Sequence, residues 1–174
     1  MPKNIEIKAA LPNRASIEER VAALANEGPI EIVQDDTFFA CTSGRLKLRQ
    51  LSESDGKLIH YARENSIGPK VSEFMVSSTA EPGVLKEVLA RSLGAAGRVR
   101  KVRTLYVVGR TRVHLDQVAD LGDYLELEVV LRDDEDEQQG QLEAQDLMSK
   151  LGVSEHQLTG SSYLELLAAK AGSA

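Results

Sequence analysis

The sequence predicts an α+β fold built on a largely antiparallel β-sheet. Eight segments alternate apolar and polar residues with a period of two, which is typical of strands. A few other segments carry apolar residues at helical spacing, and short turns separate several of the strands. Strands joined in this way pair antiparallel, so we expect amphipathic helices to flank the sheet.

The first element is the strand NIEIKA at the start of the chain. Asn4, Glu6 and Lys8 alternate there with Ile5 and Ile7, so one face is polar and the other is aliphatic. An acid and a base two residues apart suit either a solvated strand face or the wall of a charged site.

A helix is predicted next, in NRASIEERVAALANEG. Ser16 is its expected N-cap, Glu19 its capping-box residue, and Gly28-Pro29 its end. The acidic run 133–137 is expected to begin a later helix and to be solvated. The other strands are predicted at residues 30–40, 44–52, 57–64, 70–78, 98–109, 110–120 and 123–132. The other helices are predicted at residues 81–94, 139–152 and 161–170.

The composition indicates one globular domain over residues 1–170, with a disordered tail at 171–174. Of 174 residues, 42% are hydrophobic and 28% charged, which is enough to bury a core without disulfides. The net charge of −6 and the absence of Trp argue against binding to nucleic acid or an anionic membrane. A single Cys41 and the lack of a long apolar run or signal peptide favour a cytoplasmic protein. We expect it to be a monomer or a homodimer.

The charges on the strands are sorted by sign. Residues 89–115 contain seven Arg or Lys side chains and no acid, and acids return from Asp116 onward. An ordinary sheet with one solvated face usually mixes its charges. The apolar stripes of the helices also need a partner, and the aliphatic strand faces can provide one.

These observations lead to the hypothesis of a closed, eight-stranded antiparallel β-barrel with its charged faces inside. A barrel of this size can hold one small ligand. Its expected lining is Glu6, Lys8, Lys47, Arg49, Arg63, Lys101, Arg103, Arg112, Asp116, Glu126 and Glu128.

The lining predicts the chemistry of the ligand. Buried charges need compensation, and this set holds seven basic and four acidic side chains, so it calls for a polyanion. Carboxylates gathered from Glu6, Glu126 and Glu128 suit a hard cation, Mg²⁺ or Mn²⁺. A polyphosphate or nucleotide bound together with such a cation meets both demands.

The same motifs resemble the CYTH superfamily, the triphosphate tunnel metalloenzymes, which include class IV adenylyl cyclases and thiamine triphosphatases. The hallmark E-x-E-x-K strand of that family corresponds to N-I-E-I-K at Asn4 to Lys8. Further matches, in chain order, are QDDTFF, GRLKLR, YARE, KVRTLY, RVHLD, LGDYLELE and SYLELL. The stretch RTLYVVGRTRVHLDQVADLGDYLELE is most similar to the cyclase-like branch.

The resemblance implies roles for the lining residues. The metal ligands would be Glu6, Glu126 and Glu128, with Asp116 as a fourth. The phosphates would be held by Lys8, Lys47, Arg49, Arg63, Lys101, Arg103 and Arg112. The catalytic residues would be Glu6, Lys8, Glu126 and Glu128.

Other polar residues are assigned simpler positions. Arg45 and Arg110 suit either phosphate binding or a tunnel rim in solvent. His60 and His114 are expected in structural or solvent-facing positions. Asp35 and Asp36 are expected at a turn or strand edge. Tyr163 is expected to pack in its helix, within reach of the tunnel mouth.

The family pattern is broken at Asn4, which stands where the first glutamate is expected. An amide oxygen can bind a cation but adds no charge, so divalent affinity should fall and a second metal is in doubt. The leading hypothesis is a metal-dependent triphosphatase acting on an organic or inorganic triphosphate. The alternatives are a class IV-type adenylyl cyclase and a polyphosphate- or nucleotide-binding protein with little turnover.

Overall fold

Eight strands and four α-helices make up the chain in a computed structural model, which describes residues 2–173. The strands are β1 (Lys3–Ala10), β2 (Glu27–Phe39), β3 (Arg45–Gln50), β4 (Gly56–Arg63), β5 (Lys70–Thr79), β6 (Ala95–Val108), β7 (Thr111–Val118) and β8 (Gly122–Val130). The helices are α1 (Arg14–Leu24), α2 (Pro82–Leu93), α3 (Glu137–Leu151) and α4 (Tyr163–Gly172), with a short 3₁₀ turn η1 (Glu155–Gln157) before α4.

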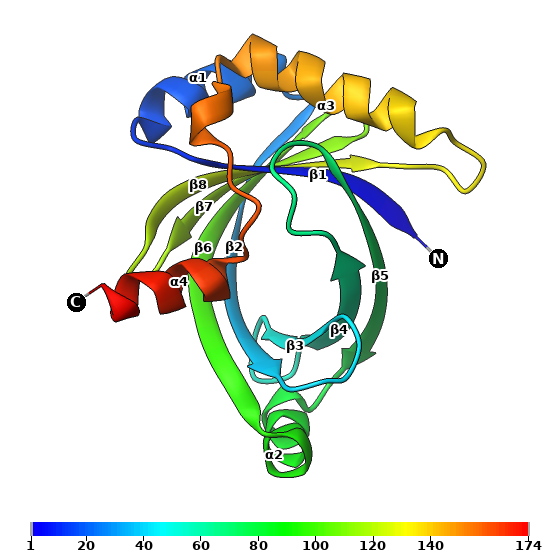
Figure 1. Cartoon of the computed structure of the whole chain (residues 1–174), viewed down its shortest axis with the longest axis vertical. Coiled ribbons are helices and arrows are strands. Elements are labelled where there is room, and N and C mark those ends of the chain that lie inside the picture. The colour runs from blue at the N-terminus through cyan, green and yellow to red at the C-terminus, as the bar shows by residue number, and fades with distance from the viewer. Residues whose placement is uncertain (1, 174) are drawn as a thin grey trace.

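The strands close into a ring in which every neighbouring pair is antiparallel. Their order around the ring is β1-β5-β4-β3-β2-β6-β7-β8, and β8 returns to β1 (Figure 1). The predicted α+β fold with a closed antiparallel sheet is therefore confirmed. Closure leaves no free edge and gives the ring an inside and an outside.

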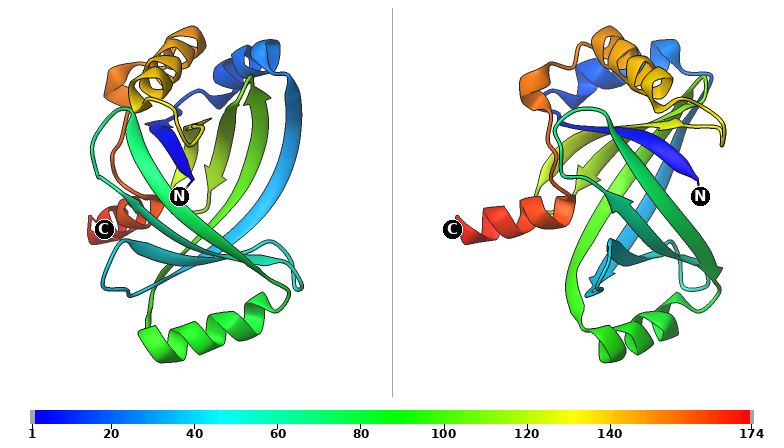
Figure 2. Two further views of the ribbon diagram at one scale, coloured as in Figure 1. Left: turned by 90° about the vertical axis from the view of Figure 1, so that its right-hand side faces the viewer. Right: turned by 45° about the vertical axis from the view of Figure 1, so that its right-hand side comes forward.

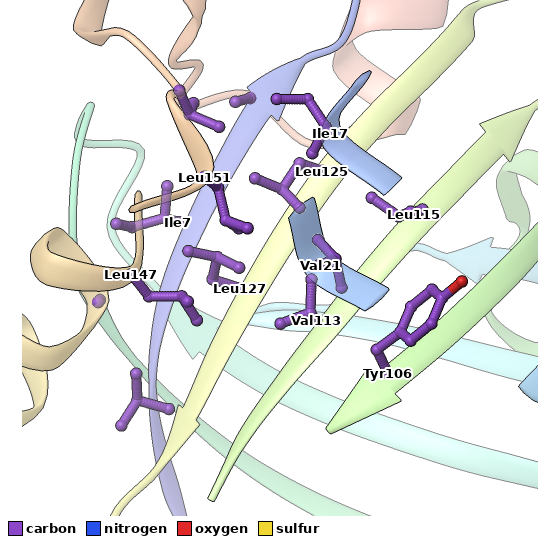
Figure 3. Close-up of a cluster of buried hydrophobic side chains, with 14 of the residues drawn as sticks. Ile7, Ile17, Val21, Tyr106, Val113, Leu115, Leu125, Leu127, Leu147 and Leu151 are labelled. Atoms are coloured by element: carbon purple, nitrogen blue, oxygen red, sulfur yellow. The ribbon is translucent and has the colours of Figure 1, made fainter. Parts of the chain in front are cut away.

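The aliphatic strand faces point outward and form the main core under two helices. Ile5, Ile7 and Leu127 are fully buried there, against α1 and α3. Figure 3 shows Ile17 and Val21 of α1 and Leu147 and Leu151 of α3 packed over Val113, Leu115, Leu125 and Leu127 of β7 and β8. This arrangement turns the charged faces of the same strands inward.

The other two helices lie away from this core. Helix α2 connects β5 to β6 at the end of the molecule opposite to α1 and α3 (Figure 2). Helix α4 lies beside β6, and the segment that leads into it crosses one mouth of the ring. Within the described residues, no helix is long and apolar enough to cross a membrane.

Three predicted boundaries are corrected. Helix α1 begins at Arg14, because the Asn13 side chain accepts a hydrogen bond from the Ser16 backbone N–H and makes Asn13 the N-cap. The helix ends at Leu24, so Gly28-Pro29 lies inside β2. At the C-terminus, α4 continues through Gly172, so the tail expected from residue 171 is helical at first, and residue 174 lies outside the described residues.

Candidate functional site

The inside of the ring is a charged lumen with a volume of about 370 Å³. Eight Lys or Arg side chains and four Asp or Glu side chains line it. The structure places every predicted site residue except Asp116 on this wall. The acidic side chains in the wall are Glu6, Asp36, Glu126 and Glu128, and the basic ones are Lys8, Lys47, Arg49, Lys57, Arg63, Lys101, Arg103 and Arg112.

Asp116 is a partner of Arg103 and not an available metal ligand. Its carboxylate accepts two hydrogen bonds of 2.7 Å from Arg103 and one of 2.8 Å from the Tyr163 hydroxyl, and it is fully buried. Burial would raise the pKa of Asp116, but the charge and hydrogen bonds of Arg103, together with the charge of Lys101, outweigh burial and lower this pKa to about 2. The expectation that Asp116 holds the metal is therefore revised, because both of its oxygens are already engaged.

Arg103 in turn orients Glu126. Its Nη2 donates to Glu126 Oε2 at 2.8 Å as well as to Asp116. A series of hydrogen bonds that runs from Tyr163 through Asp116 and Arg103 thus fixes the orientation of the Glu126 carboxylate in the lumen.

Asp36 is the centre of the basic cluster, whereas the sequence placed it at a turn or strand edge. Its carboxylate lies 3.0 Å from Lys47 Nζ, 2.7 Å from Arg49 Nη2 and 3.7 Å from Lys101 Nζ. Burial would raise the pKa of Asp36, but these three cations hold it well below its usual range. Burial also lowers the pKa of Lys101 to about 7. One buried carboxylate therefore gathers three of the predicted phosphate-binding groups.

Glu126 and Glu128 on β8 form the acidic cluster together with His114 on β7. One ligand atom from each of the three lies within 4.8 Å of the other two. His114 is buried and points into the lumen, so of the two positions expected for it, structural or solvent-facing, the solvent-facing one is wrong. Oxygen and imidazole donors at this spacing fit a divalent cation.

Glu6 stands next to this cluster on the neighbouring strand, opposite Glu128. Its carboxylate lies 3.6 Å from Arg63 Nε. Burial, and then the charges of Glu126 and Glu128, raise the pKa of Glu6 to about 7. It is not one of the three residues whose ligand atoms converge within 4.8 Å.

Asn4 faces the lumen, as its place in the first strand predicted. It is buried and shares the polar face of β1 with Glu6 and Lys8. In the amide orientation that satisfies both polar atoms, its nitrogen donates to the Lys3 carbonyl and its oxygen accepts from Arg112 Nη2, each at 3.1 Å.

The mouth beside α4 is crossed by the segment that precedes this helix. Lys8 Nζ donates to the Ser161 carbonyl at 3.4 Å and lies 4.1 Å from the centre of the Tyr163 ring, while Arg63 donates to the Gly160 carbonyl at 3.1 Å. Arg45 pairs with Glu165 at this rim, 3.2 Å away. The role of Tyr163 was hidden from strand periodicity because α4 lies outside the sheet.

The opposite mouth is open and partly apolar. Following the strand registers around the ring places Ile32, Val76 and Leu105 in one layer, beyond Asn4, and Val76 is 49% exposed. Arg112 and Lys57 border this mouth. Arg110 lies elsewhere: it pairs with Glu135 and Glu143 on the outer surface near α3.

Comparison with known proteins places the chain in a family. The CYTH domain model matches residues 2–163, and the chain therefore belongs to the CYTH family. The predicted family resemblance is thus confirmed. A search of curated proteins found no match.

Solved structures share the fold. The PH1012 protein of Pyrococcus horikoshii superimposes with a TM-score of 0.82 at 22% identity, covering 94% of this chain and 99% of that one. An adenylate cyclase candidate from Vibrio parahaemolyticus has a TM-score of 0.80 at 17% identity, covering 95% and 97%. HpAC1 from Hippeastrum, a candidate adenylyl cyclase described as having a dominant triphosphatase activity, has a TM-score of 0.66 at 16% identity, covering 98% and 96%.

Proposed function

We propose that this protein is a divalent-metal-dependent triphosphatase that hydrolyses a triphosphate inside the lumen. The observation that carries the proposal is the excess of cations on the wall of the lumen, eight basic against four acidic side chains, beside converging carboxylates. A triphosphate supplies the negative charge that this wall lacks, and the carboxylates supply oxygen ligands for the accompanying metal.

The binding groups are the basic side chains around Asp36 and at the α4 mouth. Arg49 presents a planar guanidinium suited to phosphoryl oxygens, while Lys47 and Lys101 act as point charges. A preorganised cationic wall stabilises the charge that builds up on a phosphoryl group during transfer, and it does so without reorganisation.

The acidic side is proposed to hold the metal through Glu126 and Glu128. When bound, Mg²⁺ or Mn²⁺ would neutralise phosphate charge and polarise the reacting phosphoryl group. The chain's own chemical step is proton transfer. Water attacks the terminal phosphorus, the bond to the bridging oxygen breaks, diphosphate leaves with that oxygen, and Glu6 takes a proton from the water. A pKa near 7 suits Glu6 to this role.

The apolar mouth favours a substrate with an organic group on its triphosphate. Ile32, Val76 and Leu105 offer contacts that inorganic tripolyphosphate cannot use. The same mouth keeps the cyclase alternative open, in which the ribose 3′-oxygen attacks the α-phosphorus and pyrophosphate leaves. The dominant triphosphatase activity described for HpAC1 supports hydrolysis as the first choice. We keep the cytoplasm as the proposed location, on the basis of the single Cys41.

A product assay tests the proposal. The protein is incubated with Mg²⁺ or Mn²⁺ and with ATP, thiamine triphosphate or tripolyphosphate. We expect phosphate release that Arg49→Ala reduces about 100-fold, while Arg91→Ala on the exposed face of α2 leaves it unchanged. Cyclic nucleotide with pyrophosphate would establish the cyclase instead, and binding without products would establish a binding protein.

A further inference from the structure

The His114 imidazole is a buried polar group that has no hydrogen-bond partner among the described residues. Its side chain is 5% exposed, and Nδ1 makes no hydrogen bond to any described residue. The nearest acidic oxygen, Glu128 Oε1, lies 3.8 Å away, which is beyond hydrogen-bond distance. Buried polar atoms are normally paired, so this nitrogen calls for a partner that is not a protein group.

An imidazole nitrogen that carries no proton has a lone pair that can bind a cation, and imidazole is a common metal ligand in proteins.

The surroundings of this nitrogen are those of a metal site. Ligand atoms from His114, Glu126 and Glu128 lie within 4.8 Å of one another. Ligands about 2.0–2.2 Å from a shared ion lie up to about 4.4 Å apart, so little movement is required. Arg103 holds Glu126 Oε2 and Arg112 holds Glu128 Oε2, each at 2.8 Å, so each carboxylate has a second oxygen that no arginine engages.

We propose that His114 is a direct nitrogen ligand of the divalent cation, alongside Glu126 and Glu128, and that it makes the site select Mn²⁺ or Co²⁺ over Mg²⁺. Mg²⁺ is a hard ion that demands oxygen ligands, whereas divalent first-row transition metals also accept an imidazole nitrogen, with an affinity that rises from Mn²⁺ to Co²⁺. The proposal rests on the proposed function, because it concerns the metal site of the same lumen. It concerns binding, however, and needs no turnover to be tested.

Metal binding to the protein without substrate provides the test. Pulsed electron paramagnetic resonance of bound Mn²⁺ reports hyperfine coupling to a directly bonded nitrogen. Titrations of Mn²⁺, with Mg²⁺ as competitor, give the preference between the two ions. We expect nitrogen coupling in the wild type, and its loss in His114→Gln.

The variant also tests selectivity. His114→Gln should weaken Mn²⁺ binding about tenfold or more and leave Mg²⁺ binding nearly unchanged, because an amide oxygen replaces the nitrogen. His60→Gln is the matched control, since His60 contacts the Ser43 carbonyl at 3.0 Å and does not line the lumen. It should keep both the coupling and the preference.

Each outcome decides the proposal. Absence of nitrogen coupling in wild type with bound Mn²⁺, or absence of Mn²⁺ binding, would overturn it. Equal metal preference in a folded His114→Gln variant would also overturn it and would leave a water molecule as the partner of Nδ1. If the variant does not fold, the wild-type coupling decides alone. Nitrogen coupling without triphosphate turnover would support His114 as a metal ligand and refute the proposed triphosphatase function. Turnover with Mg²⁺ but no nitrogen coupling would support the triphosphatase function and refute His114 as a metal ligand.

Discussion

At the residue scale, Asp36 decides whether the basic cluster can exist in the empty protein. It is 1% exposed and contacts Lys47, Arg49 and Lys101. We expect Asp36→Asn to lower the free energy of unfolding by about 3–5 kcal/mol, because buried cations lose their counter-charge. Urea unfolding at pH 7 measures the loss.

The adjacent residue gives a matched control. Asp35 pairs with Arg98, whose side chain is 55% exposed, so Asp35→Asn should cost less than about 1 kcal/mol. Tripolyphosphate should stabilise Asp36→Asn more than wild type, since its charge replaces the lost carboxylate. Equal losses in the two variants would show that Asp36 does not organise the cluster.

Asn4→Glu tests the residue at which the chain departs from the family pattern. The new carboxylate would enter the lumen near Arg112 and Glu6, and we expect it to tighten Mn²⁺ binding about tenfold, which is ~1–2 kcal/mol. Calorimetric titration measures the affinity, and Asn4→Gln is the neutral control. Weaker binding of tripolyphosphate without tighter metal binding would show that Asn4 is adapted to the substrate itself.

Strand periodicity located most of these residues but not their partners. One strand face carries Arg112, His114 and Asp116, so the inward position of His114 could be predicted from the sequence. The sequence does not say, however, which side chains surround this histidine. Asp36 likewise shares a face with Gln34. The pairing of Asp116 with Arg103 depends on the register between β6 and β7, which alternation alone does not provide.

At the scale of elements, the approach of α3 to β1 depends on Gly140. A Cβ at this position would lie 2.6 Å from Leu131 Cδ2 and 2.8 Å from Ile5 Cγ1. Gly83, in the first turn of α2, has nothing within 4 Å of the same position. Substitution of the two glycines by alanine therefore distinguishes the effect of helix propensity, which both positions share, from the effect of packing, which only Gly140 has.

We expect Gly140→Ala to be less stable than Gly83→Ala by about 1–3 kcal/mol. Both variants gain helix propensity, but only Gly140→Ala crowds the core. Thermal unfolding followed by circular dichroism compares them. If Gly140→Ala is stabilised as much as Gly83→Ala, the helix can shift without cost and its close approach to β1 is not specified.

The elements themselves were largely predictable because alternation in strands is strong and a closed ring must bury one face. The first residues of the helices were less predictable from the sequence. Asn13 and Ser16 both suit an N-cap, and local sequence does not say which one the chain uses. The segment from residue 158 to α4 shows no periodicity, so its crossing of the tunnel mouth could not be predicted.

At the scale of the whole molecule, the fold places its hydrophobic core outside the ring and buries charges within it. The charged lumen therefore opposes folding, and the core under α1 and α3 offsets it. Because the buried charges titrate, the free energy of unfolding depends on pH, and Lys101 is one group that causes this dependence.

Lys101→Met is the last test, and its sign follows from proton binding. The Lys101 pKa is about 7 in the folded protein and 10.5 ordinarily, so between these values the unfolded chain binds the extra proton. Stability from this group therefore rises as pH increases from 7 to 10.5. Glu6, with its pKa raised from 4.5 to about 7, changes stability in the opposite direction and only below pH 7.

We expect Lys101→Met to be more stable than wild type at pH 7, by about 1–3 kcal/mol, and the difference to shrink toward pH 10. Saturating tripolyphosphate should reduce the wild-type slope, because phosphate charge beside Lys101 raises its pKa. Chemical unfolding at several pH values, with and without tripolyphosphate, measures both effects. A difference between wild type and variant that does not change with pH would mean that Lys101 keeps its ordinary pKa, and that the lumen is more hydrated than its burial indicates.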